Sequence, residues 1–191
     1  MADILATRFL KYQDPAGGLA VGLVPCGQGR LLWYVQFDAQ RHPFTGTTGA
    51  ERAAFIHGLV GEWGEPIAER IRRTDFELSY VWNTSDLDPL PSLHGANAVL
   101  IGDAAHPFLP FTSQGVNAAL ADVRTLGACL VQELGAGATR VDPVALERAL
   151  ERYSNERLPE ITRIVTSGRL LRERFLHPHR FPGDKVIPIS K

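Results

Sequence analysis

The residues best suited to chemistry lie within one stretch of the sequence, residues 98–122. The uncharged run from Ala98 to Ile101 is expected to form a buried strand, and Gly102-Asp103 follows it directly. A loop with two prolines then leads to a predicted helix that begins near Gln114-Gly115. Ligands of open α/β sheets bind at such places, beyond the carboxyl ends of strands and against helix N-termini.

Two features of this stretch suit a ligand. Glycine lets another group approach the backbone closely, and the carboxylate of Asp103 can accept hydrogen bonds from hydroxyl groups. The N–H groups of Gly115, Val116 and Asn117 have no partner within the helix, and the helix macrodipole adds a partial positive charge there. A ligand that carries both a polyol and an anionic group would fit both features.

The same residues also have structural interpretations. Asp103 could cap a turn or helix, and Asn117 could satisfy backbone groups in the first helical turn. His106 could act as a general base, but the absence of a partner carboxylate at motif spacing favours a structural loop histidine. For Asp122 and Arg124, a helix surface or an ion pair is favoured over a role in chemistry.

Residues 1–90 are expected to form a sheet-rich portion. Strands are predicted at Ile4 to Tyr12, Leu19 to Val24, Leu31 to Phe37 and Phe76 to Trp82. Short turns with glycine join the first three strands, which indicates an antiparallel meander. Gly27-Gln28-Gly29-Arg30 is interpreted as a hairpin turn and not as a nucleotide loop, because a strand and not a helix follows it. Short helices are expected over Ala50–Leu59 and Ile67–Ile71.

Two long helices are expected within residues 91–191. The first runs from near Gln114 to about Gly135. Its expected apolar face consists of Leu120, Val123, Leu126, Leu130, Val131 and Leu134. The second begins at Asp142-Pro143, with the aspartate as N-cap, and continues towards Phe175. Pro159 is expected to kink or restart this second helix.

The aromatic residues of the predicted strand Leu31–Phe37 have two interpretations. Alternation along the strand places Trp33 and Phe37 on one face and Tyr34 on the other. Trp33 and Phe37 could pack in the core or form the wall of a pocket for an aromatic substrate. Core packing is favoured for both residues, because large aromatic side chains are mostly buried in folded proteins.

The composition describes a globular protein and excludes several classes of function. The chain has 191 residues, 45% of them hydrophobic, and a net charge of −1, so nothing indicates nucleic acid or an anionic membrane as a partner. Cys26 and Cys129 show no metal-binding or redox spacing and are expected to be free thiols in a reducing cytosol. Neither a signal-peptide pattern nor a membrane-spanning run is recognised, so a cytoplasmic location is expected.

The stretch Gly102-Asp103-Ala104-Ala105-His106, followed by Pro110 and by Gln114-Gly115-Val116-Asn117, resembles the second flavin-binding motif of the FAD-dependent aromatic hydroxylases. These are flavoprotein monooxygenases similar to para-hydroxybenzoate hydroxylase. The resemblance implies that Asp103 binds the ribityl chain of FAD. It also implies that Pro110 lies beside the isoalloxazine ring, within reach of substrate, and that the helix N-terminus faces the pyrimidine edge of the flavin.

The fold implied by the resemblance is α/β. An antiparallel or mixed sheet of the substrate domain would be followed by the last strand and the C-terminal helices of a Rossmann-like FAD-binding domain. The implied activity is that of an oxidoreductase that uses NAD(P)H and O2 to hydroxylate a small aromatic substrate through a flavin hydroperoxide. The cofactor does the chemistry, so no catalytic acid or base and no metal ligand is assigned.

The sequence also departs from the family pattern. The family opens with a strand, turn and helix that carry Gly-x-Gly-x-x-Gly, and it has a further motif that contains Asp-Gly; neither is found here. The chain is therefore expected to be the C-terminal half of a longer hydroxylase, with a missing N-terminal half or a second copy as partner. The alternative is a non-catalytic remnant that acts as an interaction module or has no function. Thr112-Ser113 replace a common glycine, which predicts a tighter loop or one held by side-chain hydrogen bonds.

Overall fold

The computed structural model describes residues 7–95, 98–137 and 139–182, in which the chain divides into two compact units. The first unit extends to Trp82 and includes the chain again from Glu173 onward, and the second unit is Asn83–Arg172. The C-terminal end therefore groups with the sheet-rich portion and not with residues 91–172. The assignment of the two units to a substrate portion and an FAD-binding portion stays a prediction.

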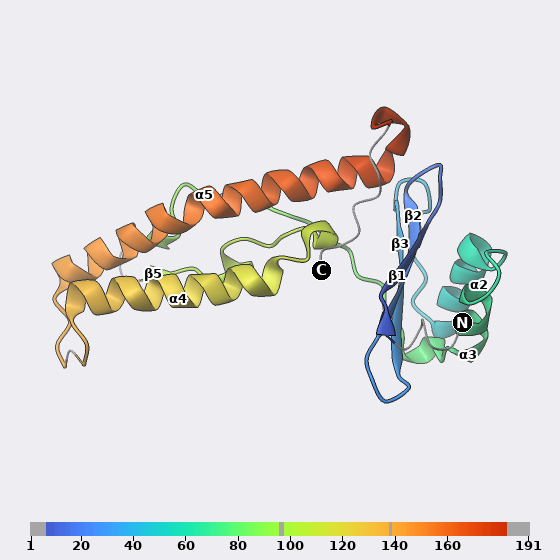
Figure 1. Cartoon of the computed structure of the whole chain (residues 1–191), viewed down its shortest axis with the longest axis horizontal. Helices are drawn as coiled ribbons and strands as arrows, with labels where there is room; N and C mark the ends of the chain where they lie inside the picture. Colours follow the sequence, from blue (N-terminus) through green and yellow to red (C-terminus); the bar gives the residue numbers. More distant parts are fainter. Residues whose placement is uncertain (1–6, 96–97, 138, 183–191) are drawn as a thin grey trace. The chain divides into compact units, whose positions relative to one another are not determined.

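A three-stranded antiparallel sheet forms the centre of the first unit (Figure 1). Its strands, in spatial order, are β1 (Leu10–Gln13), β2 (Leu19–Pro25) and β3 (Leu31–Phe37). Leu23 of β2 pairs with Leu10 on one side and with Trp33 on the other. The predicted meander and the hairpin turn at Gly27–Arg30 are confirmed. The first strand begins at Leu10, later than predicted, and Ile4 to Ala6 lie outside the described residues.

Two helices cover one face of this sheet, α2 (Gly49–Val60) and α3 (Ile67–Arg73). Both helices were predicted from the sequence, and both predictions are confirmed. A capping box starts α2: the Thr48 side chain accepts the Glu51 N–H, and the Glu51 carboxylate accepts the Thr48 N–H. The buried residues of this core are Leu19, Val21, Leu23, Val60, Ile67 and Ile71. The three β2 members alternate along the strand, so one face of β2 meets the helices.

The predicted strand from Phe76 to Trp82 is wrong. Phe76–Leu78 forms a short 3-10 helix, and the residues after it pair with no strand in the described part of the chain. The Arg52 guanidinium donates hydrogen bonds to the Phe76 carbonyl and to the Ser79 hydroxyl, and the Asp75 side chain caps the 3-10 turn. Leu78, Tyr80 and Trp82 are consequently 83%, 79% and 74% exposed. β-propensity alone does not make a strand when no neighbouring edge is free to pair with it.

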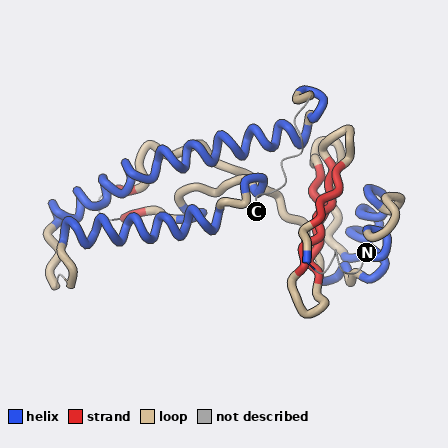
Figure 2. The backbone as a smooth tube through the Cα atoms, in the orientation of Figure 1, coloured by secondary structure: helices blue, strands red, loops and turns tan. Residues whose placement is uncertain are grey.

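Two long helices form the frame of the second unit, α4 (Gly115–Leu134) and α5 (Pro143–Leu176), and Figure 2 shows them running alongside each other. The predicted start of α5 is confirmed, because Asp142 Oδ1 accepts the Val144 N–H at 3.2 Å. The predicted restart at Pro159 is wrong, because one helix runs through this residue, whereas the predicted kink stays a prediction. Leu158 and Ile161 pack into the core on either side of the proline, and this packing outweighs the lost backbone hydrogen bond.

The core of the second unit contains the buried residues Leu93, Ala105, Cys129, Ala149, Tyr153, Ile161 and Val165. The expected buried strand from Ala98 to Ile101 is only partly formed. The strand β5 (Ala98–Val99) pairs with the equally short β4 (His94–Gly95), and Leu100 and Ile101 are each 39% exposed. A two-residue partner strand gives these side chains no sheet to be buried in, which is why the prediction of burial fails.

The predicted apolar face of α4 is divided between two environments. Leu126 and Leu130 pack against the core, as predicted. Leu120 is 64% exposed, and Val123 and Val131 are each 56% exposed. Together with Val116 they lie at helical spacing on one side of α4, and these four residues are called the exposed α4 stripe. Exposed apolar surface of this kind promotes association.

We therefore expect the isolated chain to form dimers or larger species. Replacing Leu120 and Val123 with lysine should shift the chain towards the monomer, because two charges interrupt the exposed α4 stripe. Val144→Lys is the matched control, since Val144 is 62% exposed on α5 and lies outside the stripe. Sedimentation velocity checks the result, and a wild-type chain that stays monomeric at high concentration would contradict it.

Candidate flavin-binding site

The Gly102–Asp103 turn is built as a single 3-10 turn at the end of β5, Gly102–Ala104. Gly102 has a φ of +56°, and its carbonyl accepts the N–H groups of Ala105 and His106, each at 2.9 Å. A Cβ at Gly102 would lie 3.5 Å from Ala119 Cβ, an ordinary contact, so the left-handed backbone and not a lack of space favours glycine here.

Asp103 projects into solvent from this turn. The residue is exposed, and its carboxylate makes no hydrogen bond with any residue that the structure describes. The structural alternative, in which Asp103 caps a turn or helix, would require such a hydrogen bond. The carboxylate is thus available to accept hydrogen bonds from a ligand.

The N-terminus of α4 is open in the way an anion site requires. The N-cap residue Gln114 makes no side-chain capping bond, and the first backbone bond of the helix joins the Ala118 N–H to the Gln114 carbonyl at 2.9 Å. Within the described residues, the N–H groups of Gly115–Asn117 make no hydrogen bond. A Cβ at Gly115 would meet nothing within 4 Å. The Asn117 side chain reaches only Gln114 Oε1, at 3.5 Å, and does not satisfy the backbone.

The loop between these two features is held by α5. Pro110 starts a 3-10 turn, Pro110–Thr112, and is exposed. Ser113 adopts a left-handed conformation with a φ of 54°, a backbone region that favours glycine. Thr112 Oγ1 is buried and has no hydrogen-bond partner in the described part of the chain, so the expected side-chain hydrogen bonds are not observed. The loop packs instead against α5, where a Cβ at Gly168 would lie 3.7 Å from Thr112 Cγ2.

A buried cluster of His106, Asp122 and Arg157 lies behind the turn, with 3%, 0% and 7% of their surfaces exposed. Asp122 Oδ2 lies 2.6 Å from His106 Nε2 and accepts the Gly102 N–H at 2.9 Å. Asp122 Oδ1 accepts Arg157 Nε–H at 2.7 Å. His106 therefore has a carboxylate partner, which motif spacing did not indicate, and its predicted role as a structural loop histidine and not a general base stays a prediction. Of the two alternatives for Asp122, the ion pair is observed and the helix surface is not, whereas Arg124 is exposed.

The sequence holds a signal for this cluster outside the flavin motif. Asp122 lies between Ala118 and Cys129 on the buried side of α4. Arg157 lies between Tyr153 and Ile161 on the buried side of α5. Charged residues are almost never fully buried unless they are paired, so an acid and a base on two apolar stripes indicate a buried ion pair.

Tyr153 anchors the strand that enters the turn. Its hydroxyl donates a hydrogen bond to the Leu100 carbonyl at 3.0 Å. Burial raises the pKa of the Tyr153 hydroxyl well above its usual value, the Asp122 charge raises it further, and Arg157 acts in the opposite direction. The hydroxyl therefore stays protonated at neutral pH and remains a donor.

The two aromatic residues considered as substrate contacts lie in the core of the first unit. Trp33 Nε1–H donates to Thr74 Oγ1 at 2.9 Å, and its ring meets Phe76 edge-on, with centroids 6.3 Å apart. Phe37 packs edge-on against Phe55, with centroids 5.1 Å apart. These contacts support core packing for Trp33 and Phe37. Their role towards a substrate stays a prediction, as does that of Pro110.

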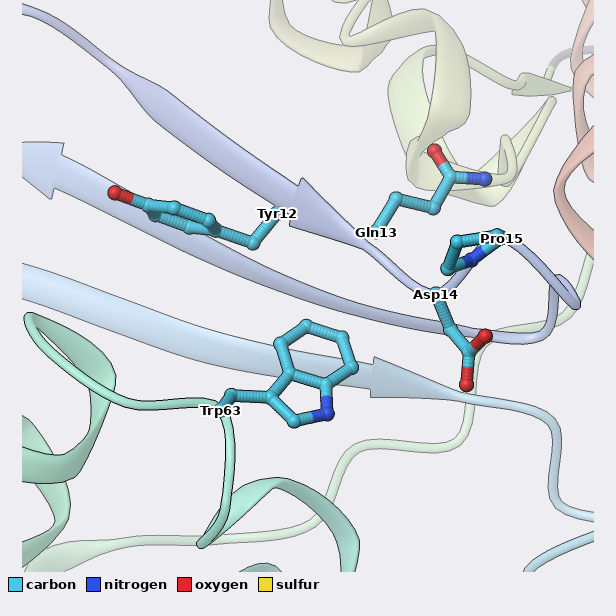
Figure 3. Close-up of a pocket in the computed structure, with 5 residues that line it drawn as sticks. All are labelled: Tyr12, Gln13, Asp14, Pro15 and Trp63. Atoms are coloured by element: carbon cyan, nitrogen blue, oxygen red, sulfur yellow. The ribbon is translucent and has the colours of Figure 1, made fainter.

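A cavity of about 340 Å³ lies elsewhere in the first unit (Figure 3). It is lined by Tyr12, Gln13, Asp14, Pro15 and Trp63, none of which is a predicted site residue.

The described residues contain no group of three or more His, Cys, Asp or Glu side chains that could hold a metal ion. None of their helices is long and apolar enough to cross a membrane.

Comparison with known proteins identifies the family. The family model of an FAD binding domain matches residues 5–167, which is more than half of the chain. The chain therefore belongs to this family of FAD-binding proteins, and the resemblance to the aromatic hydroxylases is confirmed.

Two curated relatives are monooxygenases. The 3-amino-4-hydroxybenzoate 2-monooxygenase of Streptomyces cremeus is 37% identical over 125 residues, which are 64% of this chain and 28% of the relative. The aurachin C monooxygenase/isomerase of Stigmatella aurantiaca is 32% identical over 134 residues, which are 69% of this chain and 34% of the relative. The chain thus spans about a third or less of these two relatives.

Solved structures show the same α/β fold. HpxO of Klebsiella pneumoniae, complexed with FAD and uric acid, has a TM-score of 0.72 at 21% identity and covers 91% of this chain. PqsL of Pseudomonas aeruginosa, in complex with 2-aminobenzoylacetate, has a TM-score of 0.68 at 26% identity and covers 96% of it. The matched region is 41% of the HpxO chain and 48% of the PqsL chain. The predicted fold class is confirmed.

Proposed function

We propose that this chain is the C-terminal part of an FAD-dependent aromatic monooxygenase, an oxidoreductase that uses NAD(P)H and O2. The observation that carries the proposal is the presence, within one compact unit, of an Asp103 carboxylate without a partner among the described residues and of an α4 N-terminus without a side-chain cap. The carboxylate can accept hydrogen bonds from a polyol, and the helix N-terminus can bind an anionic edge of the same ligand. They occur in a chain that belongs to an FAD-binding family.

The residues of this chain fit the cofactor. Asp103 would accept a hydrogen bond from a ribityl hydroxyl, because its carboxylate is exposed and unpartnered among the described residues. The N–H groups of Gly115–Asn117, which make no hydrogen bond in the described part of the chain, would together with the helix dipole stabilise negative charge on the pyrimidine edge. Pro110 would present an apolar, rigid surface to the ring. Bound FAD supplies the reduction of O2 and the oxygen transfer to the substrate, and the protein positions it and excludes water.

We further propose a small aromatic substrate and a cytoplasmic location. Similar proteins are named as monooxygenases of 3-amino-4-hydroxybenzoate and kynurenine and as a hydroxylase of 3-hydroxybenzoate, all of which carry an electron-rich ring. The two free cysteines, Cys26 and Cys129, fit a reducing compartment.

The partner that we propose is the polypeptide that carries the ADP-holding segment, as a continuation of this chain or as a second chain. The exposed α4 stripe is a surface that such a segment would cover. The limited share of each relative that the chain spans supports this proposal. Without that partner, two copies of the isolated chain would cover the exposed α4 stripe by associating with each other.

A polypeptide of these 191 residues should therefore bind FAD weakly or not at all, because it contains no Gly-x-Gly-x-x-Gly segment to hold the ADP part of FAD. Co-expression with the N-terminal part of the Streptomyces cremeus monooxygenase should give a complex with one flavin per chain. Flavin absorbance per polypeptide after gel filtration checks both expectations. A stoichiometric flavin on the isolated chain contradicts the need for a partner. A stable complex without flavin would instead support a non-catalytic interaction module.

A further inference from the structure

One carboxylate joins three separate segments of the second unit. Asp122, on α4, accepts the N–H of Gly102 and the ring N–H of His106 on the same oxygen, Oδ2. Its other oxygen accepts Arg157 from α5. Gly102 and His106 flank Asp103 in the sequence. The segment that carries the proposed cofactor ligand is thus tied at both ends to a single buried atom.

The protonation of the cluster follows from its hydrogen bonds. Asp122 accepts hydrogen bonds from Arg157 and from the Gly102 N–H, and we assign the hydrogen between Asp122 and His106 to His106 Nε2, so that the carboxylate is an acceptor in all three bonds. In the described part of the chain, His106 Nδ1 is buried and has no hydrogen-bond partner. The ring also stacks on Phe108, with centroids 4.6 Å apart. The stacking fixes the orientation of the His106 ring, and Nε2–H is its hydrogen-bond donor towards Asp122.

The Gly102–Asp103 turn needs such support. Gly102 populates left-handed and right-handed backbone conformations almost equally, so its φ of +56° is not fixed by its own sterics. Ordering a flexible ligand-binding segment when the ligand arrives weakens binding, whereas a segment that is already ordered avoids this cost. The buried position of Asp122, with its charge balanced by Arg157, supplies that order from the helices behind the turn.

We propose that Asp122 is a positioning residue that holds the Gly102–Asp103 turn in its ligand-receiving conformation before any cofactor binds, with His106 and Arg157 as its supports. The proposal rests on the proposed FAD site for its functional meaning. It also assigns the Gly102 N–H to Asp122 and not to the cofactor. Asp103 then provides the only side-chain acceptor of this turn for the ligand.

Amide hydrogen exchange of the isolated chain, followed by NMR, tests the positioning directly. In Asp122→Asn, exchange of the Gly102 N–H should become about tenfold faster relative to the Ile161 N–H, because a charge-assisted bond is replaced by a neutral one. Ile161 is fully buried on α5 and reports opening of the whole unit. Asp86→Asn is the matched control, since Asp86 pairs with Arg169 of α5 at 2.6 Å and does not contact the turn.

A second variant keeps the test decisive if Asp122→Asn does not fold. His106→Phe retains the stacking on Phe108 but removes one of the two bonds to Oδ2, and it should also accelerate Gly102 exchange relative to Ile161. A purely structural cluster would raise both exchange rates equally. Unchanged relative exchange of Gly102 in every folded variant overturns the proposal.

FAD binding by the complemented protein separates this proposal from the proposed function. Asp122→Asn should weaken FAD binding per folded molecule about tenfold, and Asp86→Asn should leave it unchanged. Faster Gly102 exchange with unchanged FAD affinity overturns the role of the turn towards the cofactor. If wild-type complemented protein binds no FAD while Gly102 exchange responds as expected, the flavin function fails and the positioning of the turn stands.

Discussion

Asp122→Ala should lower the free energy of unfolding of the second unit by about 3–5 kcal/mol, the cost of breaking a buried ion pair from one side. The substitution leaves the Arg157 guanidinium, which is only 7% exposed, without its counter-charge. It also leaves the Gly102 N–H and His106 Nε2–H without an acceptor. Urea unfolding followed by circular dichroism measures the loss, because α4 and α5 provide most of the helical signal of this unit.

Two control variants show how much of the stability loss comes from the burial of the Asp122–Arg157 ion pair and how much from the unpaired charge of Arg157. Asp86→Ala breaks the ion pair with Arg169, whose side chain is 38% exposed, and should have a much smaller effect because solvent screens that charge. Combining Asp122→Ala with Arg157→Met should recover part of the lost stability, since the uncompensated charge is removed along with its partner. Equal losses for Asp122→Ala and Asp86→Ala would show that the burial of the cluster has no energetic consequence.

The local parts of this structure were predictable from the sequence. Alternating apolar residues with glycine turns indicated β2 and β3, and Asp142-Pro143 marked the start of α5, because strand period, turn chemistry and capping depend on near neighbours. The turn at Gly102-Asp103 and the helix start at Gly115 were predictable for the same reason, because they follow each other closely in the sequence, whereas their role as a flavin site stays a prediction.

Features that depend on distant partners were not predictable in this way. His106 was interpreted without a carboxylate partner because Asp122 lies on the next helix, and the charge of Asp122 is balanced by Arg157 on a further one. The strand expected from Phe76 to Trp82 has the right composition, but the described residues offer it no edge to pair with. Leu120 lies on the predicted apolar face of its helix and is nevertheless exposed, since apolar spacing shows which side of a helix is apolar and not what covers it.

Asp103→Ala should weaken FAD binding by the complemented protein about tenfold to a hundredfold, which corresponds to about 1.5–3 kcal/mol. The change removes a charged acceptor and leaves a ribityl hydroxyl unpaired in a closed site. Asp103→Asn should lose less, because the amide oxygen still accepts a hydrogen bond. Titration of FAD fluorescence measures the affinity, and Glu151→Ala, which removes an exposed acid on α5, controls for the change in net charge.

The fold should survive both Asp103 substitutions, because the carboxylate is exposed and makes no hydrogen bond with the described residues. Asp103→Ala and Asp122→Ala therefore have opposite signatures: the first lowers FAD affinity at unchanged stability, and the second lowers stability and disturbs the turn. Urea unfolding of the isolated Asp103→Ala chain provides the comparison. If Asp103→Ala unfolds the chain while FAD affinity per folded molecule stays the same, Asp103 is a structural cap, and the flavin interpretation of the turn loses its central residue.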